Sequence, residues 1–283
     1  MVQVEIVMRT PQTLGVEAKG ARSHDDRRDY HSHFCRVDDE MGEVEKVPQA
    51  DLYPSEVVTI GILVARKGGR FRAFCRWLKR DYDPLFGGLP DRSTLQRQLR
   101  AQQIHADKLL GSPALLNVID SFPIELLFPI RQGRSKQQIG KKNRDKGRWS
   151  IGIKLCWILN TLGQVVGWHW LTMNCPDQDF LPLLDLLRDD GLVLSDLGFR
   201  CKGGTPVNLK VCPKGTWNDR MMIETVFSLL TVVCQSKKMF HRTAAHLEAR
   251  LAYTAAMFNV LLHLFWQLHP DDAFKLSIAE FSL

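Results

Sequence analysis

Two aspartates follow short apolar runs, at positions where a fold could bring their carboxylates together. Asp120 comes directly after Leu116–Ile119, and Asp196 follows Leu192–Leu194 after one serine. Apolar runs of this length predict buried strands. Ligands of open α/β sheets bind at the edge where parallel strands end. If the two strands are parallel neighbours, both carboxylates leave the sheet at the same edge.

Glu224 is the third acidic candidate, on a helix predicted over residues 219–233. It lies among apolar residues, one turn after Arg220 and one turn before Ser228. A charge in these surroundings needs a partner. Carboxylates that are brought close together repel each other unless a divalent cation is present. The set therefore predicts a metal site for phosphoryl transfer, and its catalytic and metal-binding residues are Asp120, Asp196 and Glu224.

Each acid taken singly also has an ordinary explanation, because turns after strands favour aspartate. Four other acids lie nearby in the sequence and are left outside the predicted set: Glu125, Asp177, Asp179 and Asp185. What distinguishes the three candidates is their combination of two strand ends and one helix with intervening basic residues.

A basic segment at residues 131–148 follows the first aspartate strand, with Asp145 as its only acid. Three glycines predict a flexible loop beside the site, suited to a phosphate backbone and weakened by salt. A solvated charged loop is the alternative. The predicted DNA contacts in this segment are Arg131, Arg134, Lys136, Lys141, Lys142, Arg144, Lys146 and Arg148.

Three stretches carry a resemblance to a known family: Val118-Ile119-Asp120-Ser121, Val193-Leu194-Ser195-Asp196-Leu197-Gly198-Phe199 and Trp217-Asn218-Asp219-Arg220-Met221-Met222-Ile223-Glu224. They resemble the DDE transposases of bacterial insertion sequences. The third is similar to the family signature Tyr-x2-Arg-x3-Glu-x6-Lys, with Trp217 in place of the tyrosine and Thr231 in place of the lysine. Gly87–Arg97 also resembles the family's N-terminal helical segment, so the resemblance covers roughly residues 52 to 265.

The resemblance implies an RNase H-like catalytic core with two Mg²⁺ ions, or Mn²⁺, bridged by Asp120 and completed by Asp196 and Glu224. It implies endonuclease cleavage at insertion-sequence ends and strand transfer. Arg220 would contact DNA or orient Glu224, and the remaining DNA contacts expected are Trp217, Lys237 and Lys238. The implied partners are double-stranded DNA, as terminal repeats and target, and a second copy in a homodimer.

Two alternatives to a transposase stay open. One is an RNase H-like nuclease without strand transfer, and the other is a catalytically inactive DNA-binding relic of a transposase. The presence of all three acids argues against decay, while the irregular first 50 residues argue mildly for it.

The predicted helices and strands that must position these residues indicate an α/β protein. We expect an RNase H-like mixed sheet flanked by helices, with a small N-terminal all-helical module. Strands are predicted at 115–119, 151–157, 165–172, 192–194 and 207–211, and helices at 179–189, 219–233 and 244–268. The predicted divisions are an irregular arm at 1–50, a helical module at 51–112, a catalytic domain at 113–270 and a tail at 271–283.

The helical module is predicted to contain three helices. The first starts at Pro54, the second spans 70–82, and Asp91 or Ser93 caps the third. The basic third helix favours a helix-turn-helix-like DNA-binding module. An ordinary bundle with a basic surface explains the same pattern.

Composition agrees with a basic intracellular protein. The net charge of +7 favours a polyanionic partner. The seven cysteines include no C-x-x-C pair, which disfavours zinc ribbons and disulfide scaffolds. The apolar run 255–266 is short for a membrane span, so a core helix is expected. Cysteines that lie in apolar runs favour a reducing cytoplasm, and the resemblance implies a bacterial protein. Three tryptophans at strand positions are expected in the core rather than stacked on DNA bases: Trp157, Trp168 and Trp170.

Overall fold

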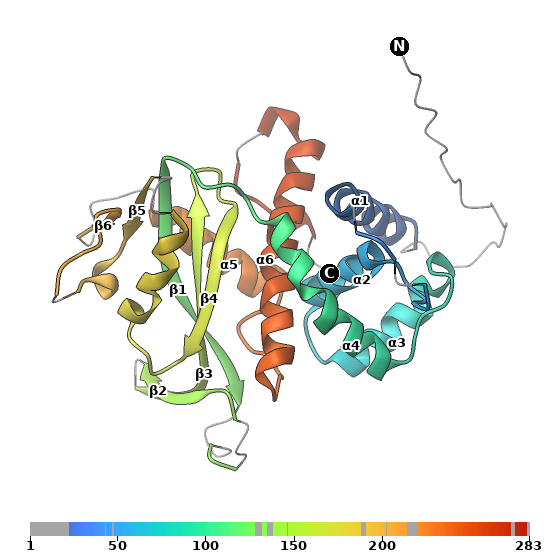
Figure 1. The fold of residues 1–283 in the computed structure, drawn as a ribbon, viewed down its shortest axis with the longest axis horizontal. Coiled ribbons are helices and arrows are strands. Elements are labelled where there is room, and N and C mark those ends of the chain that lie inside the picture. The colour runs from blue at the N-terminus through green and yellow to red at the C-terminus, as the bar shows by residue number, and fades with distance from the viewer. Residues whose placement is uncertain are drawn as a thin grey trace.

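The computed structural model of the chain describes residues 23–42, 44–46, 48–127, 132–134, 138–145, 147–187, 191–201, 203–213, 220–272 and 275–281. It is an α/β protein with a mixed six-stranded sheet flanked by helices (Figure 1). The strands are β1 (Leu116–Leu127), β2 (Lys141–Asp145), β3 (Arg148–Asn160), β4 (Val165–Thr172), β5 (Leu192–Ser195) and β6 (Leu209–Val211). The α/β class with a mixed sheet is therefore confirmed.

The sheet has an antiparallel half and a parallel half that meet at β1. Strand β3 pairs antiparallel with β1 along one edge and with β2 and β4 along the other. On the opposite side of β1, β5 and then β6 are added in parallel.

The described helices include six α-helices and several short 3₁₀ turns. The α-helices are α1 (Ser23–Met41), α2 (Pro54–Lys67), α3 (Phe71–Tyr82), α4 (Arg92–Gln102), α5 (Arg220–Val233) and α6 (Ala244–Leu268). The 3₁₀ turns used below are η2 (Gln103–Leu109), η4 (Asp177–Leu187) and η5 (Leu197–Phe199).

Strand alternation gives the sheet two apolar faces. On one face, the fully buried Trp157 ring packs against Phe227 of α5 and Phe258 of α6, with ring centroids 6.1 Å and 5.7 Å away. On the other face, Ile119 and Cys156 belong to a smaller apolar cluster with residues of η4 and η5. The expectation that Trp157 belongs to the core is confirmed.

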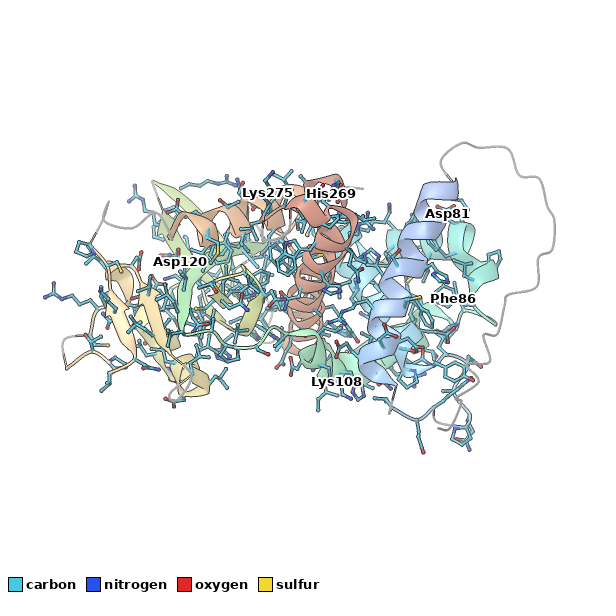
Figure 2. The ribbon with its side chains drawn as sticks, turned by 90° about the horizontal axis from the view of Figure 1, so that it is seen from above. Asp81, Phe86, Lys108, Asp120, His269 and Lys275 are labelled. Atoms are coloured by element: carbon cyan, nitrogen blue, oxygen red, sulfur yellow. The ribbon has the colours of Figure 1, made fainter. Side chains whose placement is uncertain are left out.

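Helix α6 lies between the sheet and the N-terminal helices, as two perpendicular views show (Figures 1 and 2). It contacts α2, η2 and β4, and one apolar cluster runs from α1 through α6 to the sheet. By length and composition alone α6 could cross a membrane, but 78% of its most apolar window is buried inside the protein. This confirms the predicted core helix. The predicted boundary between the helical module (51–112) and the catalytic domain (113–270) therefore falls within one shared core.

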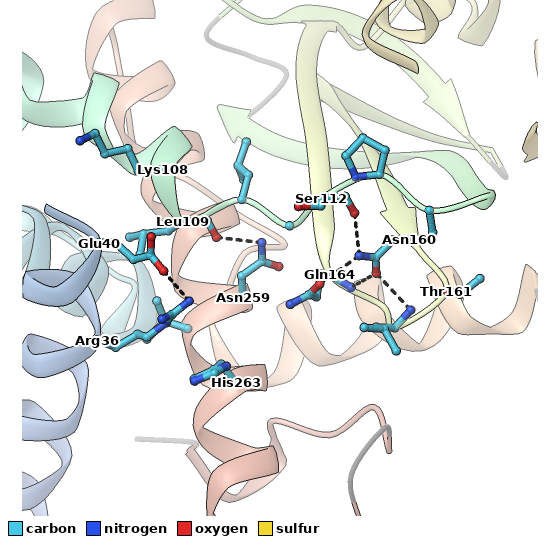
Figure 3. A pocket seen from close by; sticks show the side chains of 16 residues that line it. Arg36, Glu40, Lys108, Leu109, Ser112, Asn160, Thr161, Gln164, Asn259 and His263 are labelled. Atoms are coloured by element: carbon cyan, nitrogen blue, oxygen red, sulfur yellow. Dashed lines mark hydrogen bonds and ion pairs between the residues drawn. The ribbon is translucent and has the colours of Figure 1, made fainter. Parts of the chain in front are cut away.

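A buried asparagine joins α6 to the sheet and to η2. Asn259 Nδ2 donates to the carbonyls of Leu109 (3.0 Å) and Val165 (2.9 Å), and Asn259 Oδ1 accepts from the Val165 N–H (2.7 Å). It lines a cavity of about 550 Å³ between α1, α6 and the β3–β4 turn (Figure 3). Asn160 closes that turn by accepting from the backbone N–H groups of Leu162 and Gln164.

The predicted helices at 54, 70–82 and 91 agree with α2, α3 and α4. Asp91 is the N-cap of α4, accepting from the N–H groups of Ser93 (2.8 Å) and Thr94 (3.2 Å). Three residues separate α2 from α3, whereas nine separate α3 from α4. A helix-turn-helix needs a turn of about 3–4 residues, so α3 rather than α4 follows the short turn. DNA binding by this module remains a prediction.

Strand β1 was predicted to end at residue 119 but continues to Leu127. Three other elements differ from expectation. The first is α1, a helix of 19 residues in the predicted irregular arm, whose buried His33, Val37 and Met41 form a stripe at helical spacing. Residues 1–22 lie outside the described part of the chain. The predicted α-helix at 179–189 is instead the 3₁₀ turn η4, which contains Pro182, a residue that removes an α-helical hydrogen bond.

The third difference is β2, which forms within the segment predicted to be a flexible loop. Arg144 pairs with Trp149 and Lys142 with Ile151 across the ladder. Both cations lie over the Trp149 ring, with Lys142 Nζ 4.5 Å and Arg144 Cζ 5.8 Å from its centroid. These cation–π contacts and the ladder hydrogen bonds offset the low strand preference of charged residues.

Replacing Asn259 by leucine keeps the side-chain volume but removes the three hydrogen bonds. Val165 O would retain the Gly111 N–H at 2.8 Å, whereas the Val165 N–H and Leu109 carbonyl would lose a buried partner. The free energy of unfolding should fall by about 3 kcal/mol, measured by urea denaturation. Thr161→Ala, at an exposed position of the neighbouring turn, is the control, and equal stability of both variants would contradict the assigned role.

Candidate active site

The parallel pairing of β1 with β5 sets the end of β5 toward the middle of β1. Asp196 follows the end of β5 as predicted, whereas Asp120 lies inside β1, which continues to Leu127, so the prediction that its strand ends at residue 119 is wrong. The pairing matches Asn117 with Val193 and Val118 with Leu194. The pairing ends there, two residues before Asp120 in β1 and two residues before Asp196.

Alternation along β1 places Asp120 on the sheet face that α5 covers. Asp120 pairs with Trp157, and facing residues of an antiparallel ladder point to the same side. Trp157 and Phe122, the second residue after Asp120, both pack against Phe227 of α5. Asp120 therefore shares its face with the helix that carries Glu224.

Helix α5 packs against β1 through two aromatic rings. Phe122 of β1 stacks on Phe227 of α5 with ring centroids 5.2 Å apart. Asp120 lies two residues before Phe122 in β1, and Glu224 lies three residues before Phe227 in α5. Both acids are therefore close in sequence to the residues that join this strand and this helix.

Asp177, excluded by the sequence analysis, lies at this site. Its Oδ1 accepts from Ser121 Oγ (2.7 Å) and from the Lys154 ammonium (2.8 Å). Ser121 follows Asp120 directly in β1, and Lys154 comes from β3. Asp177 begins η4, after the turn that leaves β4. The excluded carboxylate is thus tied to the strand that carries the first predicted catalytic residue.

Asp196 is a neighbour of Asp177. The Asp196 carboxylate accepts from the Gly198 N–H at 2.8 Å and caps η5. A Cβ built on Gly198 would lie 2.8 Å from Asp177 Oδ2 and 2.9 Å from Asp196 Oδ1. Both carboxylates therefore border one small space that a side chain at position 198 would fill.

The charges of this region act on a buried thiol. Burial raises the pKa of Cys156 well above its usual value, and the negative charges of Asp120 and Asp177 raise it further, whereas Lys154 lowers it. Cys156 pairs with Ser121 in the β1–β3 ladder. The thiol is therefore held neutral, and its two acidic neighbours concentrate negative charge at the middle of β1.

The described residues contain no group of three or more Asp, Glu, His or Cys side chains that could hold a metal ion as they stand. The predicted acids are neighbours through their elements rather than a formed ligand set. Asp196 is engaged at the start of η5, and Glu224 is exposed on α5. The predicted metal site would require these carboxylates to turn toward one another.

The described residues of the predicted DNA-contact set divide into exposed cations and cations held by an acid. Arg134, Lys141 and Lys237 are exposed. Glu125 Oε2 lies 3.5 Å from Arg148 Nη2 and Glu125 Oε1 lies 3.6 Å from Lys238 Nζ. Lys142 and Arg144 are exposed on β2 over Trp149. Four predicted contacts lie outside the described residues: Arg131, Lys136, Lys146 and Trp217. The same holds for the side chain of Arg220.

Glu125 also explains why Lys237 and Lys238 lie next to the sheet. The Glu125 N–H donates to the Lys237 carbonyl at 3.0 Å, and the Met239 N–H donates to the Glu125 carbonyl at 2.9 Å. The segment after α5 is thereby attached to β1 five residues beyond Asp120. Lys237 is the cation of this pair that projects into solvent.

Comparisons with models of known protein families and with curated proteins found no match to this chain.

Proposed function

We propose that the chain is a metal-dependent phosphoryl-transfer enzyme that acts on DNA as a DDE transposase, with Asp120, Asp196 and Glu224 as its catalytic residues. The observation that supports this proposal is the parallel β1–β5 pairing, which leads the chain toward Asp120 and toward Asp196 in the same direction. Helix α5 brings Glu224 along the same sheet face. An antiparallel β4–β3–β1 half continued by parallel β5 and β6 is also compatible with an RNase H-like fold.

The donor set suits a hard divalent cation such as Mg²⁺ or Mn²⁺, because every candidate ligand is a carboxylate oxygen. Asp120, Asp196 and Glu224 would hold the cation together. When bound, such ions activate the attacking oxygen and stabilise the leaving oxygen of a phosphodiester. Like charge among the acids keeps them apart until a cation is present.

The protein's own share of the reaction is to hold the DNA in line with the carboxylates. The β2–β3 hairpin presents Lys141, Lys142 and Arg144 as exposed cations on a paired strand. A rigid strand positions phosphates better than a loop does, because less conformational freedom is lost on binding. Cutting and joining at two element ends would further require two copies of the chain, so a homodimer on DNA is part of the proposal.

An RNase H-like nuclease would use the same carboxylates, and a relic would keep only the basic surface. Incubation of the protein with a DNA that has a precut 3′-hydroxyl end and with a target duplex distinguishes the transposase, the nuclease and the relic. Joined product supports the transposase, cleavage without joining supports the nuclease, and binding without either reaction supports the relic.

Replacing Asp120 by asparagine should reduce Mg²⁺-dependent cleavage by about 1000-fold or more, because a metal ligand is lost at the reacting phosphate. DNA binding, measured by fluorescence anisotropy without metal, should stay unchanged. Asp179→Asn removes an exposed acid of η4 and serves as the control. Cleavage by Asp120→Asn at the control's rate would exclude the proposed mechanism.

Asp177 is expected to position the proposed catalytic carboxylates rather than to contact DNA. Asp177→Asn should weaken its bonds to Lys154 and Ser121, and raise the Mg²⁺ concentration for half-maximal cleavage by about tenfold or more. The same titration on Asp179→Asn should match the unmodified protein. A purely structural role for Asp177 would instead lower thermal stability with the Mg²⁺ dependence unchanged.

The double variant Lys142→Ala/Arg144→Ala should weaken DNA binding without regard to sequence. Affinity falls as salt rises, and each lost phosphate contact makes the slope of log affinity against log salt less steep by about 0.9. Loss of both contacts should therefore reduce the magnitude of this slope by about 2. Lys46→Ala, which removes a cation lying over Tyr53 before α2, is the control. An unchanged salt slope in the double variant would mean that β2 does not contact DNA.

A further inference from the structure

A second cavity lies away from the carboxylates, between the α2–α3 turn, α4 and the start of α6. Its volume is about 360 Å³. Much of its wall is apolar and aromatic, formed by Phe71, Phe74, Leu99, Phe240 and Tyr253. Tyr253 is fixed there, because its hydroxyl donates to the Leu99 carbonyl at 2.8 Å. The cavity is large enough for one flat aromatic ligand.

The rest of the lining carries positive charge. Arg100 of α4 and Arg242 before α6 are exposed at the rim, and Arg250 follows on α6. His246 also lines the cavity, and burial and the charge of Arg100 lower its pKa, so it adds no charge there. Among the described residues that line this cavity there is neither aspartate nor glutamate. The cavity thus combines an aromatic wall with unmatched cations.

Arg250 is the most buried of these cations, with 7% of its surface exposed. Its Nη2 donates to the Ala65 carbonyl at 2.6 Å, which is a neutral partner. Burial lowers the pKa of Arg250 to about 10, with Cys234 as the opposing influence. A buried cation paired with a neutral carbonyl favours the arrival of an anion.

Two further polar groups lie at the same place. The first turn of α6 opens onto the cavity through Thr243 and His246, and the first N–H groups of a helix have no partner within the helix. Helix N-termini therefore bind phosphate readily. Beside them, the buried Nδ1 of His241 has no hydrogen-bond partner among the described residues.

We propose that this cavity binds one nucleotide unit, with the base against the aromatic wall and the phosphate at Arg100, Arg242 and the start of α6. A nucleotide has the two features that the lining demands, an aromatic ring and an adjacent anion. The inference rests on the proposed function only in taking DNA as the source, since an unpaired terminal nucleotide and a free mononucleotide share this chemistry.

The test uses the full chain with EDTA and 2-aminopurine, whose fluorescence changes when the base leaves a stack. The free 2-aminopurine deoxynucleoside 5′-monophosphate forms one arm. The other arms are a duplex with 2-aminopurine in an unpaired 5′ overhang and the same duplex fully paired. Saturable binding of the overhang alone assigns a DNA end, and binding of the mononucleotide as well assigns a general nucleotide site.

Arg242→Ala and Arg100→Ala should each weaken that binding by about tenfold. Ala249→Phe, which fills the cavity without changing charge, should abolish it, while circular dichroism checks the fold. Arg97→Ala is the matched control, because Arg97 is an exposed arginine of α4 that is not among the lining residues.

Two results would overturn the inference: no saturable signal in any arm, or equal weakening by Arg97→Ala and Arg242→Ala. Asp120→Asn should bind these probes as the unmodified chain does. Loss of the cavity site would therefore leave the carboxylate proposal standing, and loss of cleavage would leave the cavity site standing.

Discussion

The parallel pairing of β1 with β5 is the constraint on which the rest of the candidate site depends. Strand β5 has only four residues, yet it is held on both sides, by β1 through Leu116–Val118 and by β6 through Leu209–Val211. A parallel neighbour leads the chain toward Asp196 in the same direction in which β1 leads it toward Asp120. The last residue of β5, Ser195, is fully buried and pairs with Val211 of β6, and Asp196 follows it directly.

Helix α6 extends that constraint to the N-terminal helices. Its burial on all sides, and the hydrogen bonds of Asn259 to η2 and β4, join the helices and the sheet through one core. The cavity at the start of α6 and the carboxylates of the sheet therefore belong to the same body. If DNA contacted both the cavity and the carboxylates, the distance between its two contacts would be fixed by the protein. A fixed distance suits the proposed enzyme, which would have to hold a DNA end while cutting it.

The sequence predicted what depends on local chemistry. Helices α2 to α4 and α6 follow from apolar spacing and from caps such as Asp91, and the apolar runs before Asp120 and Asp196 predicted β5 and the first residues of β1. The rest of β1, from Asp120 to Leu127, was not predicted because its ladder with β3 extends the strand beyond the apolar run. Strand β2 was missed because a ladder partner, rather than its own charged residues, makes it a strand. Helix α1 was underestimated because only a thin apolar stripe in a highly charged segment contacts α2 and α6.

Asp177 was missed for a different reason. Its contacts to Ser121 and Lys154 span 56 and 23 residues of sequence, and only the register of β1 against β3 creates them. Because successive residues of a strand point to opposite faces, Asp120 and Ser121 serve two sides of the sheet. Asp120 lies on the face that α5 covers, while Ser121 donates to Asp177 on the side of η4. A change at Asp177 or Ser121 can therefore shift the Asp120 carboxylate through the single peptide bond between Asp120 and Ser121. No contact between η4 and α5 is needed for this effect.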